Sequence, residues 1–222
     1  MTTVEIYLIQ DKADMGEISY LELLYKLGFI SDFLIIEEIA NMQHIGTKPL
    51  ETERLILRRY EIDDAEDMFA NWVTDQDVTR FWDWEPHKDI ATTRILLNQW
   101  MQAYENLDNY HWVIVCKANS QAIGYIYLNA INNSERSAAV HYLISRVYWN
   151  QGLMSEACNR VIEFAFRDVG FHKIYSWHHS ENPASGRVLQ KCGMTLTKTE
   201  YRKMDNEHLS GEYHYYGIDK NI

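Results

Sequence analysis

Two short segments hold the residues best suited to chemistry, and the first of them is a turn that could bind an anion. It runs from Trp149 to Ala157 and places Gly152 between a predicted strand and a predicted helix. The first turn of a helix exposes about four backbone N–H groups and about half a positive charge, so this arrangement suits a phosphate. Gly152 and Ser155 are equally compatible with an ordinary turn and helix start. The turn alone leaves both interpretations open.

The second segment, SENPASGRVLQKCGM, begins at Ser180 and contains a predicted helix start. Asn182 is a natural N-cap residue, Pro183 suits the first helical position, and Ser185 then lies at the third position, within reach of the cap. These residue types alone predict a capped helix that presents an amide and a hydroxyl at its beginning.

The histidines and cysteines do not predict a metal site. His111, His178 and His179 lack the spacing of metal ligands. The three cysteines include no CxxC pair, which excludes a disulfide framework or a zinc site, and Cys158 and Cys192 fit small buried side chains. We therefore expect no metal.

Composition narrows the class of protein. The chain has 222 residues, 46% of them hydrophobic, and a formal charge of −11, which favours a folded protein and argues against binding nucleic acid through its phosphates. The longest apolar run, residues 33–36, is far too short to span a membrane, and the acidic N-terminus is unlike a signal peptide. We expect no membrane association and a cytoplasmic location.

The chain divides at about residue 48. Residues 1–48 carry a net charge of −5, and residues 49–222 carry the other −6, so only part of the acidic character belongs to the second segment. Two short helices are predicted, one around residues 18–27 and one over 32–41. Because two short helices cannot form a core, we expect them to dock on the following domain or on another subunit, which leaves a homodimer open. Met42 resembles a native start, so residues 1–41 are expected to be an upstream extension.

Residues 49–222 show an α+β pattern. Strands are predicted over 55–60, 111–117, 122–130, 137–145, 173–178, 194–203 and 211–218, and helices over 63–72, 90–105, 152–168 and 183–191. The three strands between 111 and 145 predict an antiparallel meander, and the helix after Gly152 predicts a parallel crossover to the next strand.

Together, these motifs resemble the GCN5-related N-acetyltransferases (GNAT), in the branch that acetylates N-terminal amines of ribosomal proteins. The resemblance spans about residues 52–218 and rests on five segments: the run ETERLILR from Glu51, the stretch WEPH from Trp84, the pair Ile123-Gly124, the turn YWNQGLMSEA and the block NPASGRVLQKCGM. It implies a mixed, bent sheet whose fourth and fifth strands splay apart and leave a slot for acetyl-CoA.

The resemblance also implies which residues hold acetyl-CoA. Its pantetheine arm would lie along the fourth strand, and its pyrophosphate would bind the backbone N–H groups at the start of the helix. Asn182 and Ser185 would lie close to the thioester end. Trp149 and Met154 depart from the family's usual Arg or Gln and Gly or Ala, and the Met154 side chain must point away from the phosphates. The implied donor-binding residues are Tyr142, Leu143, Ile144, Gln151, Gly152, Leu153, Met154, Ser155, Asn182 and Ser185.

Acetyl transfer to an amine needs a neutral amine, a stabilised oxyanion and a proton for the departing thiolate. By resemblance, Ser185 would supply the proton, with Asn182 beside it. The carboxylate that many relatives carry on the fourth strand, in a Glu-Ile-Gly-Tyr-like run, is absent here, where the matching residues are Ala139 to Tyr142. His141 in this run is either a proton relay or a structural residue. Glu85 and His87 lie in a loop that relatives place near the acceptor, and a water chain is a further candidate for the base.

Nearby aromatic residues have two interpretations. Trp82 and Trp84 alternate with acidic residues and favour a pocket for a cation, whereas Trp100 and Tyr104 share a helical face and favour core packing. The sequence therefore predicts an enzyme that moves an acetyl group from acetyl-CoA to a peptide N-terminus or a small amine. The alternative is a non-catalytic acyl-CoA-binding module whose N-terminal extension recruits a partner.

Overall fold

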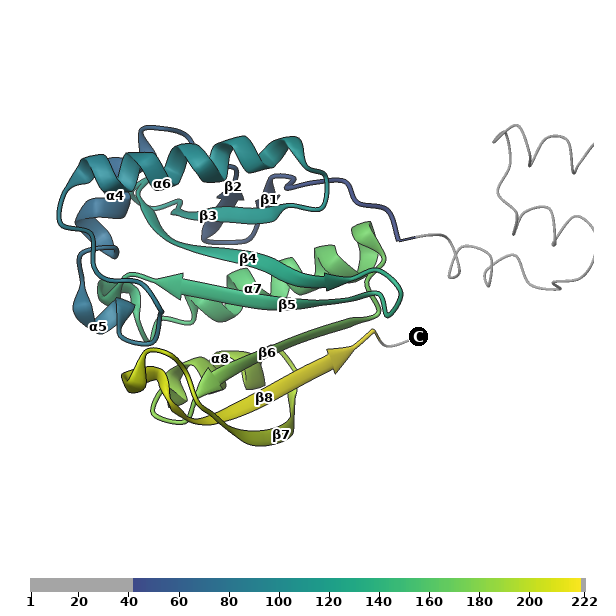
Figure 1. Ribbon diagram of the computed structural model, residues 1–222. Coiled ribbons are helices and arrows are strands. Elements are labelled where there is room, and N and C mark those ends of the chain that lie inside the picture. The colour runs from purple at the N-terminus through teal and green to yellow at the C-terminus, as the bar shows by residue number, and fades with distance from the viewer. Residues whose placement is uncertain (1–41, 221–222) are drawn as a thin grey trace, which may run out of the picture. The chain divides into compact units, whose positions relative to one another are not determined.

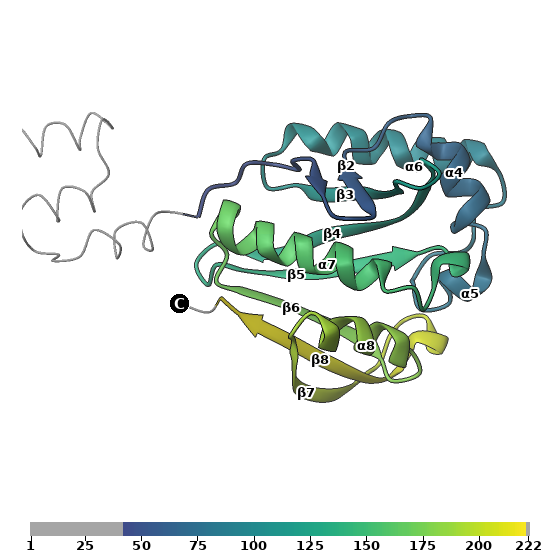
Figure 2. The ribbon, with the colours of Figure 1, turned by 180° about the vertical axis from the view of Figure 1, so that it is seen from behind.

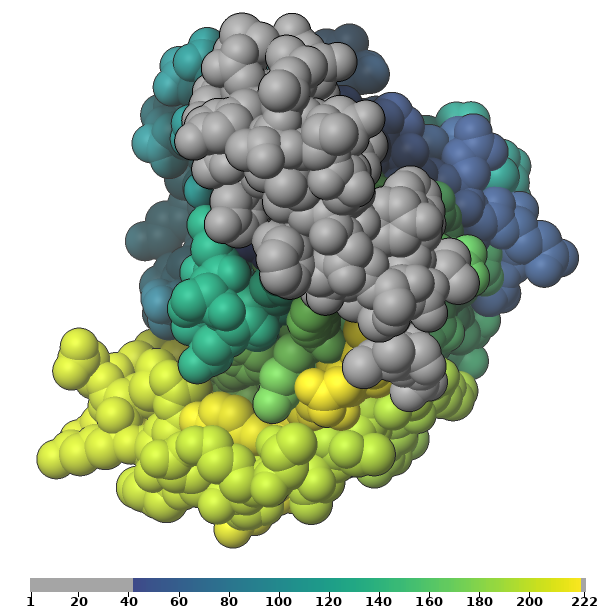
Figure 3. All heavy atoms as spheres, turned by 90° about the vertical axis from the view of Figure 1, so that its right-hand side faces the viewer, coloured from purple at the N-terminus to yellow at the C-terminus, as the bar shows by residue number. Residues whose placement is uncertain are grey.

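Eight strands pair into one sheet in the computed structural model, which describes residues 42–220. The strand order is β1-β2-β3-β4-β5-β6-β8-β7, and only β5 and β6 are parallel. Figure 3 shows the residues of β7 (yellow-green) and β8 (yellow) at one end of the described fold. The strands are β1 (Leu50–Glu51), β2 (Leu55–Arg58), β3 (Tyr110–Cys116), β4 (Ala122–Asn132), β5 (Ser137–Ile144), β6 (Lys173–His179), β7 (Thr195–Arg202) and β8 (Gly211–Asp219).

Helices cover both faces of the sheet, as Figures 1 and 2 show from opposite sides. Helices α4 and α6 pack on one face, and α7 and α8 pack on the other. The helices are α4 (Asp64–Asn71), α5 (Gln76–Thr79), α6 (Ile90–Gln102), α7 (Leu153–Phe164) and α8 (Pro183–Lys191). Short helical turns are η1 (Ala103–Glu105), η2 (Arg146–Tyr148), the π-helical η3 (Ala165–Val169) and η4 (Glu207–Leu209).

Polar side chains start several of these helices. Asp75 Oδ1 accepts a hydrogen bond from the Asp77 N–H at the start of α5, and Asp89 Oδ1 accepts one from the Thr92 N–H in α6. Asn182 does the same for the Ser185 N–H in α8. Each of these bonds satisfies an N–H group that has no partner within its helix.

Strands β5 and β6 separate soon after they meet, and this separation positions the site. They pair only at Ser137–Lys173, Ala138–Ile174 and Ala139–Tyr175. Beyond these positions β5 stays paired with β4 through Ile144, while β6 stays paired with β8. Figure 1 shows the two strands diverging from this end. The predicted splay between the family's fourth and fifth strands, here β5 and β6, is confirmed.

Gly124 allows β4 to lie unusually close to the end of β5. A Cβ atom at this position would lie 2.2 Å from the Leu143 carbonyl oxygen, closer than any real Cβ contact. Only glycine fits such an approach. The last residues of β5 are therefore held against β4 where the two halves of the sheet separate.

Residues 43–48, which the sequence placed with the extension, are bound to the sheet domain. The Gln43 N–H donates to the Val169 carbonyl, the Gly46 N–H donates to the Leu107 carbonyl, and Trp112 Nε1 donates to the Lys48 carbonyl. The described residues from Gln43 onward belong to one compact unit. The two helices predicted within residues 18–41 lie outside the described residues.

Most predicted elements are found, within a few residues of their expected ends. The helix expected over 90–105 is α6 followed by η1, and the one expected over 152–168 is α7 followed by η3. The short elements β1 and α5 were not predicted. Within residues 42–220, no helix has the length and apolar character that a membrane crossing requires.

Candidate active site

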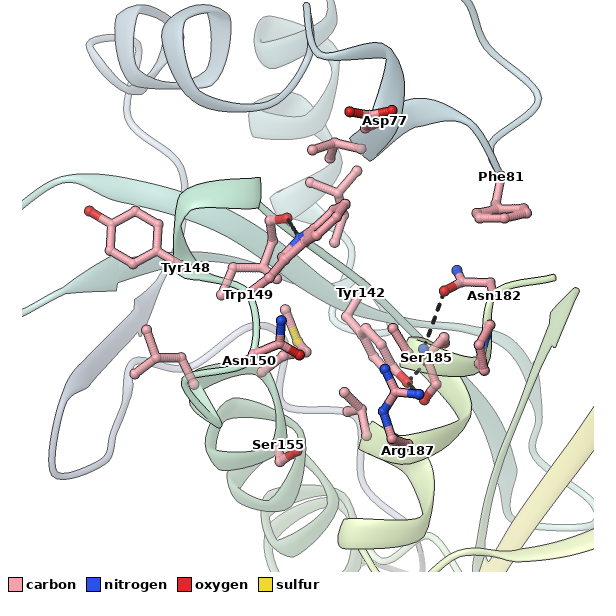
Figure 4. Close-up of a pocket in the computed structure, with 18 of the residues that line it drawn as sticks. Asp77, Phe81, Tyr142, Tyr148, Trp149, Asn150, Ser155, Asn182, Ser185 and Arg187 are labelled. Carbon is pink, nitrogen blue, oxygen red and sulfur yellow. Dashed lines mark hydrogen bonds between the residues drawn. The ribbon is translucent and has the colours of Figure 1, made fainter. Parts of the chain in front are cut away.

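A cavity of about 510 Å³ lies where β5 and β6 diverge (Figure 4). Four segments form its wall: α5 with the loop after it, the last residues of β5, the turn that leads into α7, and the first two turns of α8. Figure 4 shows Asp77 and Phe81 on one side, Asn150 and Ser155 on another, and Asn182, Ser185 and Arg187 on α8. The wall is thus built from residues that lie more than a hundred positions apart.

The turn into α7 has the geometry of an anion site. Asn150 and Gly152 both have positive φ, +61° and +78°, which bend the chain sharply before Leu153. Gly152 occupies the N-cap position and has no side chain, so no N-cap side chain accepts a hydrogen bond from the first N–H groups of α7. Since Gly152 and Ser155 both line the cavity, these N–H groups lie at its wall.

Nearly all the predicted donor-binding residues line this cavity, including Leu143, Ile144, Leu153 and Met154. Met154 is only 5% exposed, so its side chain is packed within the fold. Gln151 is the exception, because it is exposed and its Nε2 donates to the Val147 carbonyl. The nearby Trp149 donates from Nε1 to the Ile144 carbonyl at the end of β5, over 2.9 Å.

Ser185 and Asn182 lie together at the start of α8, and Tyr142 of β5 reaches them. The Tyr142 hydroxyl donates to the Ser185 carbonyl over 2.9 Å and lies 3.1 Å from Ser185 Oγ. Burial raises the pKa of Tyr142 well above its usual value, so the phenol stays protonated. Asn182 Oδ1 accepts from the Ser185 N–H over 3.3 Å, as its predicted capping role requires. A protonated hydroxyl pair therefore stands at the cavity wall.

His141 lies on the opposite face of β5 from Tyr142, because neighbouring residues of a strand alternate. Its ring contacts Tyr127 and Trp177, with centroids 5.3 and 4.6 Å away. Burial lowers the pKa of His141 to about 4, and its Nε2 has no hydrogen-bond partner among residues 42–220. The structure does not bring His141 to the cavity wall that holds Ser185.

Glu85 and His87 also lie away from this wall. Glu85 is exposed. The His87 Nδ1 atom lies 2.8 Å from Thr93 Oγ1, and burial lowers the pKa of His87, against a smaller opposing effect of Asp89. His87 lines a second cavity of about 330 Å³ beside α6. The structure therefore separates these two candidates from Ser185.

The four aromatic residues divide between the two cavities and the core. Trp82 lines the first cavity, and Trp84 and Trp100 line the second. Trp82 and Trp84 still contact each other, with ring centroids 6.5 Å apart. Tyr104 is buried, and its hydroxyl donates to the His111 carbonyl, as expected of a core residue.

Two cationic side chains of the wall were missed. Arg187 and Lys191 lie one helical turn apart on α8, on the face that also carries Pro183. The predicted helix over 183–191 already contained this signal, since i, i+4 spacing places the two charges on one face. They add positive charge beside the anion site at the start of α7.

Two arginines tie α5 and its loop across the cavity. Arg80 pairs with Glu181 before α8 over 2.8 Å, and Arg146 after β5 pairs with Asp75 and Asp77 over 3.0 and 2.9 Å. Asp77 and Glu181 are the carboxylates that line the cavity among the described residues, and both are engaged by an arginine. Within the same residues, no group of three or more histidine, cysteine or acidic side chains is arranged to hold a metal.

Comparison with known proteins assigns this geometry to a family. The family model for an acetyltransferase (GNAT) domain matches residues 54–195. The uncharacterised N-acetyltransferase YoaA of Bacillus subtilis is 31% identical over 144 residues, which cover 65% of this chain and 81% of the relative. Spermidine N(1)-acetyltransferase of Vibrio cholerae is 26% identical over 140 residues, which cover 63% of this chain and 78% of the relative.

A solved structure has the same fold. The ribosomal-protein-S5-alanine acetyltransferase of Vibrio fischeri matches with a TM-score of 0.69 at 17% identity, over 78% of this chain and 97% of that chain. The family model spans most of the described fold, from the start of β2 to the start of β7. The chain therefore belongs to the GNAT family of acetyl-CoA-dependent N-acetyltransferases.

Proposed function

We propose that this enzyme acetylates the N-terminal amine of a peptide or protein, with Ser185 as the proton donor to the departing thiolate. The observation that carries the proposal is the cavity where β5 and β6 diverge, which has the start of α7 on one side and the Tyr142–Ser185 hydroxyl pair on the other. Acetyl-CoA carries its thioester and its pyrophosphate at opposite ends of the pantetheine arm, and a site that binds both requires such an arrangement.

Three groups of residues would bind the donor. The N–H groups at Gly152 to Ser155 would hold the pyrophosphate, and Arg187 and Lys191 would add charge attraction to its phosphates. The last residues of β5 have no strand partner on the β6 side, so backbone groups other than the Ile144 carbonyl, which Trp149 engages, could pair with the amides of the pantetheine arm. A protein with an overall charge of −11 can thus hold an anion through local fields.

Ser185 is suited to deliver a proton to sulfur. Its Oγ lies at the cavity wall, 3.1 Å from the Tyr142 hydroxyl, which donates its proton to the Ser185 carbonyl. Burial keeps the phenol protonated, so rotation of its O–H from the carbonyl to Oγ would let Tyr142 restore the proton that Ser185 gives to the thiolate. Asn182 would fix the backbone of Ser185 through its cap.

A half-buried aromatic strip favours a peptide acceptor. Tyr127, His141, Trp177 and Tyr215 contact one another in sequence across four strands, on the face opposite α7 and α8. Trp82 joins this strip to the cavity, since its ring lies 6.4 Å from that of Tyr127. Aromatic rings of this kind bind peptide side chains and backbone over an extended surface.

The charges of the wall argue against a polyamine. A polyamine carries several ammonium groups and needs free carboxylates, whereas Asp77 and Glu181 are already paired with arginines. The N-terminal amine carries one charge at most. Because His141 titrates at about 4 and lies outside the wall, we assign removal of the amine proton to water.

A thiol-release assay with full-length protein tests this function. The acceptors are peptides with different N-terminal residues, the same peptides with blocked N-termini but a free lysine, and spermidine. We expect release of CoA only with free N-termini, and mass spectrometry should place one acetyl group on the α-amine. Turnover of spermidine but of no peptide would overturn the acceptor assignment, and no turnover with any amine would overturn the proposed function.

A further inference from the structure

Arg54 joins the beginning of β2 to the turn that starts α7. Its Nη1 donates to the Gln151 carbonyl over 3.0 Å, and its Nε and Nη2 lie 2.7 and 2.6 Å from Glu156 Oε2. A single planar guanidinium therefore binds both Gln151, which precedes the N-cap residue Gly152, and Glu156 in the first helical turn of α7. This two-ended contact fixes the spacing of the backbone between them.

Glu156 is held from a second direction as well. Its Oε1 accepts the Arg54 backbone N–H over 2.9 Å and the Thr52 hydroxyl over 2.5 Å. Burial would raise the pKa of Glu156, but these hydrogen bonds and Arg54 lower it below its usual value. The carboxylate is thus ionised and fully engaged.

The position of Glu156 creates an electrostatic conflict that Arg54 resolves. An acidic residue in the first turn stabilises a helix by interacting with the same partial positive charge that attracts a bound anion. An uncompensated Glu156 would oppose a phosphate at this helix start. Arg54 neutralises the Glu156 charge through their ion pair. The guanidinium also lies close to the helix start, because a Cβ atom at Gly152 would lie only 3.7 Å from Arg54 Nη2.

We propose that Arg54 is a positioning residue for the phosphate-binding turn, which it holds in shape through Gln151 and keeps receptive to an anion by neutralising Glu156. The inference rests on the proposed function, because it takes the anion at Gly152 to Ser155 to be the pyrophosphate of acetyl-CoA. Arg54, which directly precedes β2, would thus contribute to donor binding although it does not line the cavity.

The test compares two donors in full-length variants. S-acetylpantetheine has the thioester but lacks the pyrophosphate, so it reports on catalysis without the turn. We expect Arg54→Ala to raise the KM for acetyl-CoA about tenfold with little change in kcat, and to leave turnover of S-acetylpantetheine unchanged. Adding Glu156→Gln to Arg54→Ala should recover part of the affinity, because the opposing charge is then gone while the contact with Gln151 stays absent.

Two variants keep the test decisive. Arg54→Lys retains the charge but loses the two-ended contact, so it should fold and show an intermediate KM. Arg167→Ala breaks the exposed 2.6 Å pair with Glu163 beyond the other end of α7 and should leave the KM unchanged. It controls for loss of any ion pair on this helix.

Two results would overturn the inference alone: an unchanged KM in Arg54→Ala, or equal losses with both donors that Glu156→Gln does not recover. The second result would reveal a general structural role. Calorimetry with CoA separates these results from failure of the proposed function, since wild-type protein that does not bind CoA would overturn both.

Discussion

The Tyr142 hydroxyl on β5 lies 2.9 Å from the Ser185 carbonyl oxygen and 3.1 Å from Ser185 Oγ on α8, so one phenol bridges the place where the sheet divides. Neither residue can move away from the cavity without losing these contacts. The pair therefore couples the separation of β5 and β6 to the position of the proposed proton donor.

Removal of the Ser185 hydroxyl should affect chemistry more than binding. We expect Ser185→Ala to lower kcat by about 10²-fold, the scale of general acid catalysis, with the KM for acetyl-CoA changed less than about threefold. Ser180→Ala, on the same loop but outside the cavity wall, serves as the control. Steady-state kinetics with both substrates varied would detect the difference, and an unaltered kcat in Ser185→Ala would remove this residue from the mechanism.

Tyr142→Phe should lower kcat less than Ser185→Ala does, because Tyr142 would act through Ser185. The variant keeps the ring and removes the neutral hydroxyl that contacts both the carbonyl and Oγ of Ser185, so we expect kcat to fall about tenfold and stability to fall by about 1 kcal/mol. If Tyr142 acts through Ser185, the double variant should be no slower than Ser185→Ala alone. Additive losses in the double-mutant cycle would show that the two hydroxyls act independently.

The pH dependence of kcat/KM should follow the acceptor. With water as the base, the rate depends on the fraction of neutral amine, so kcat/KM for a peptide α-amine should rise with pH and level off above about pH 8. An ε-amine acceptor would instead keep rising toward about pH 10. Profiles with two peptides whose α-amine pKa values differ would test this, and profiles that do not shift between them would point to a base on the enzyme.

Arg187 and Lys191 should contribute to donor affinity through charge. We expect Arg187→Ala and Lys191→Ala each to raise the KM for acetyl-CoA by about fivefold, with a smaller effect at high salt because screening weakens the wild-type attraction. Lys203→Ala removes an exposed charge outside the cavity wall and should change neither value. Equal KM values for all four proteins at low salt would contradict the assignment.

His141 should make the fold acid-sensitive. Burial lowers its pKa from 6.5 to about 4, so between these values the unfolded chain binds more protons than the folded one, and stability falls as the pH falls. Above pH 6.5 this histidine is neutral in both states and does not lower the stability of the fold. We expect His141→Phe, which keeps an aromatic ring, to reduce the loss of Tm between about pH 7 and about pH 5. A loss as large as in wild type would show that this histidine is not the cause.

The sequence predicts the sheet well because its strands and helices have strong local patterns. Strand-like apolar runs separated by polar turns identify β3 to β5, and the N-cap residue Asn182 marks the start of α8. Element α5 escaped prediction because four residues are too few to show a helical period. Because α5 was not predicted, the sequence did not show that Asp77 and Arg80 lie at the cavity wall.

The site itself was predicted in part, and the reason lies in sequence separation. The turn at Gly152 and the helix start at Asn182 carry their function in local backbone geometry, which short motifs encode. The contact between Arg54 and Glu156 joins residues 102 positions apart and leaves no local signal. His141 was a candidate by motif position, whereas strand alternation places it on the face away from Ser185.

The limited pairing of β5 and β6 has a consequence for hydrogen exchange. Because only three residue pairs connect these strands, the segment from β6 to the C-terminal strands is a natural unit for local opening separate from β2 to β5. Amide protons near the end of β5 should therefore exchange early in the free protein. A ligand that pairs with this strand would act as the missing neighbour, and its binding would appear as slower deuterium uptake on both sides of the divide.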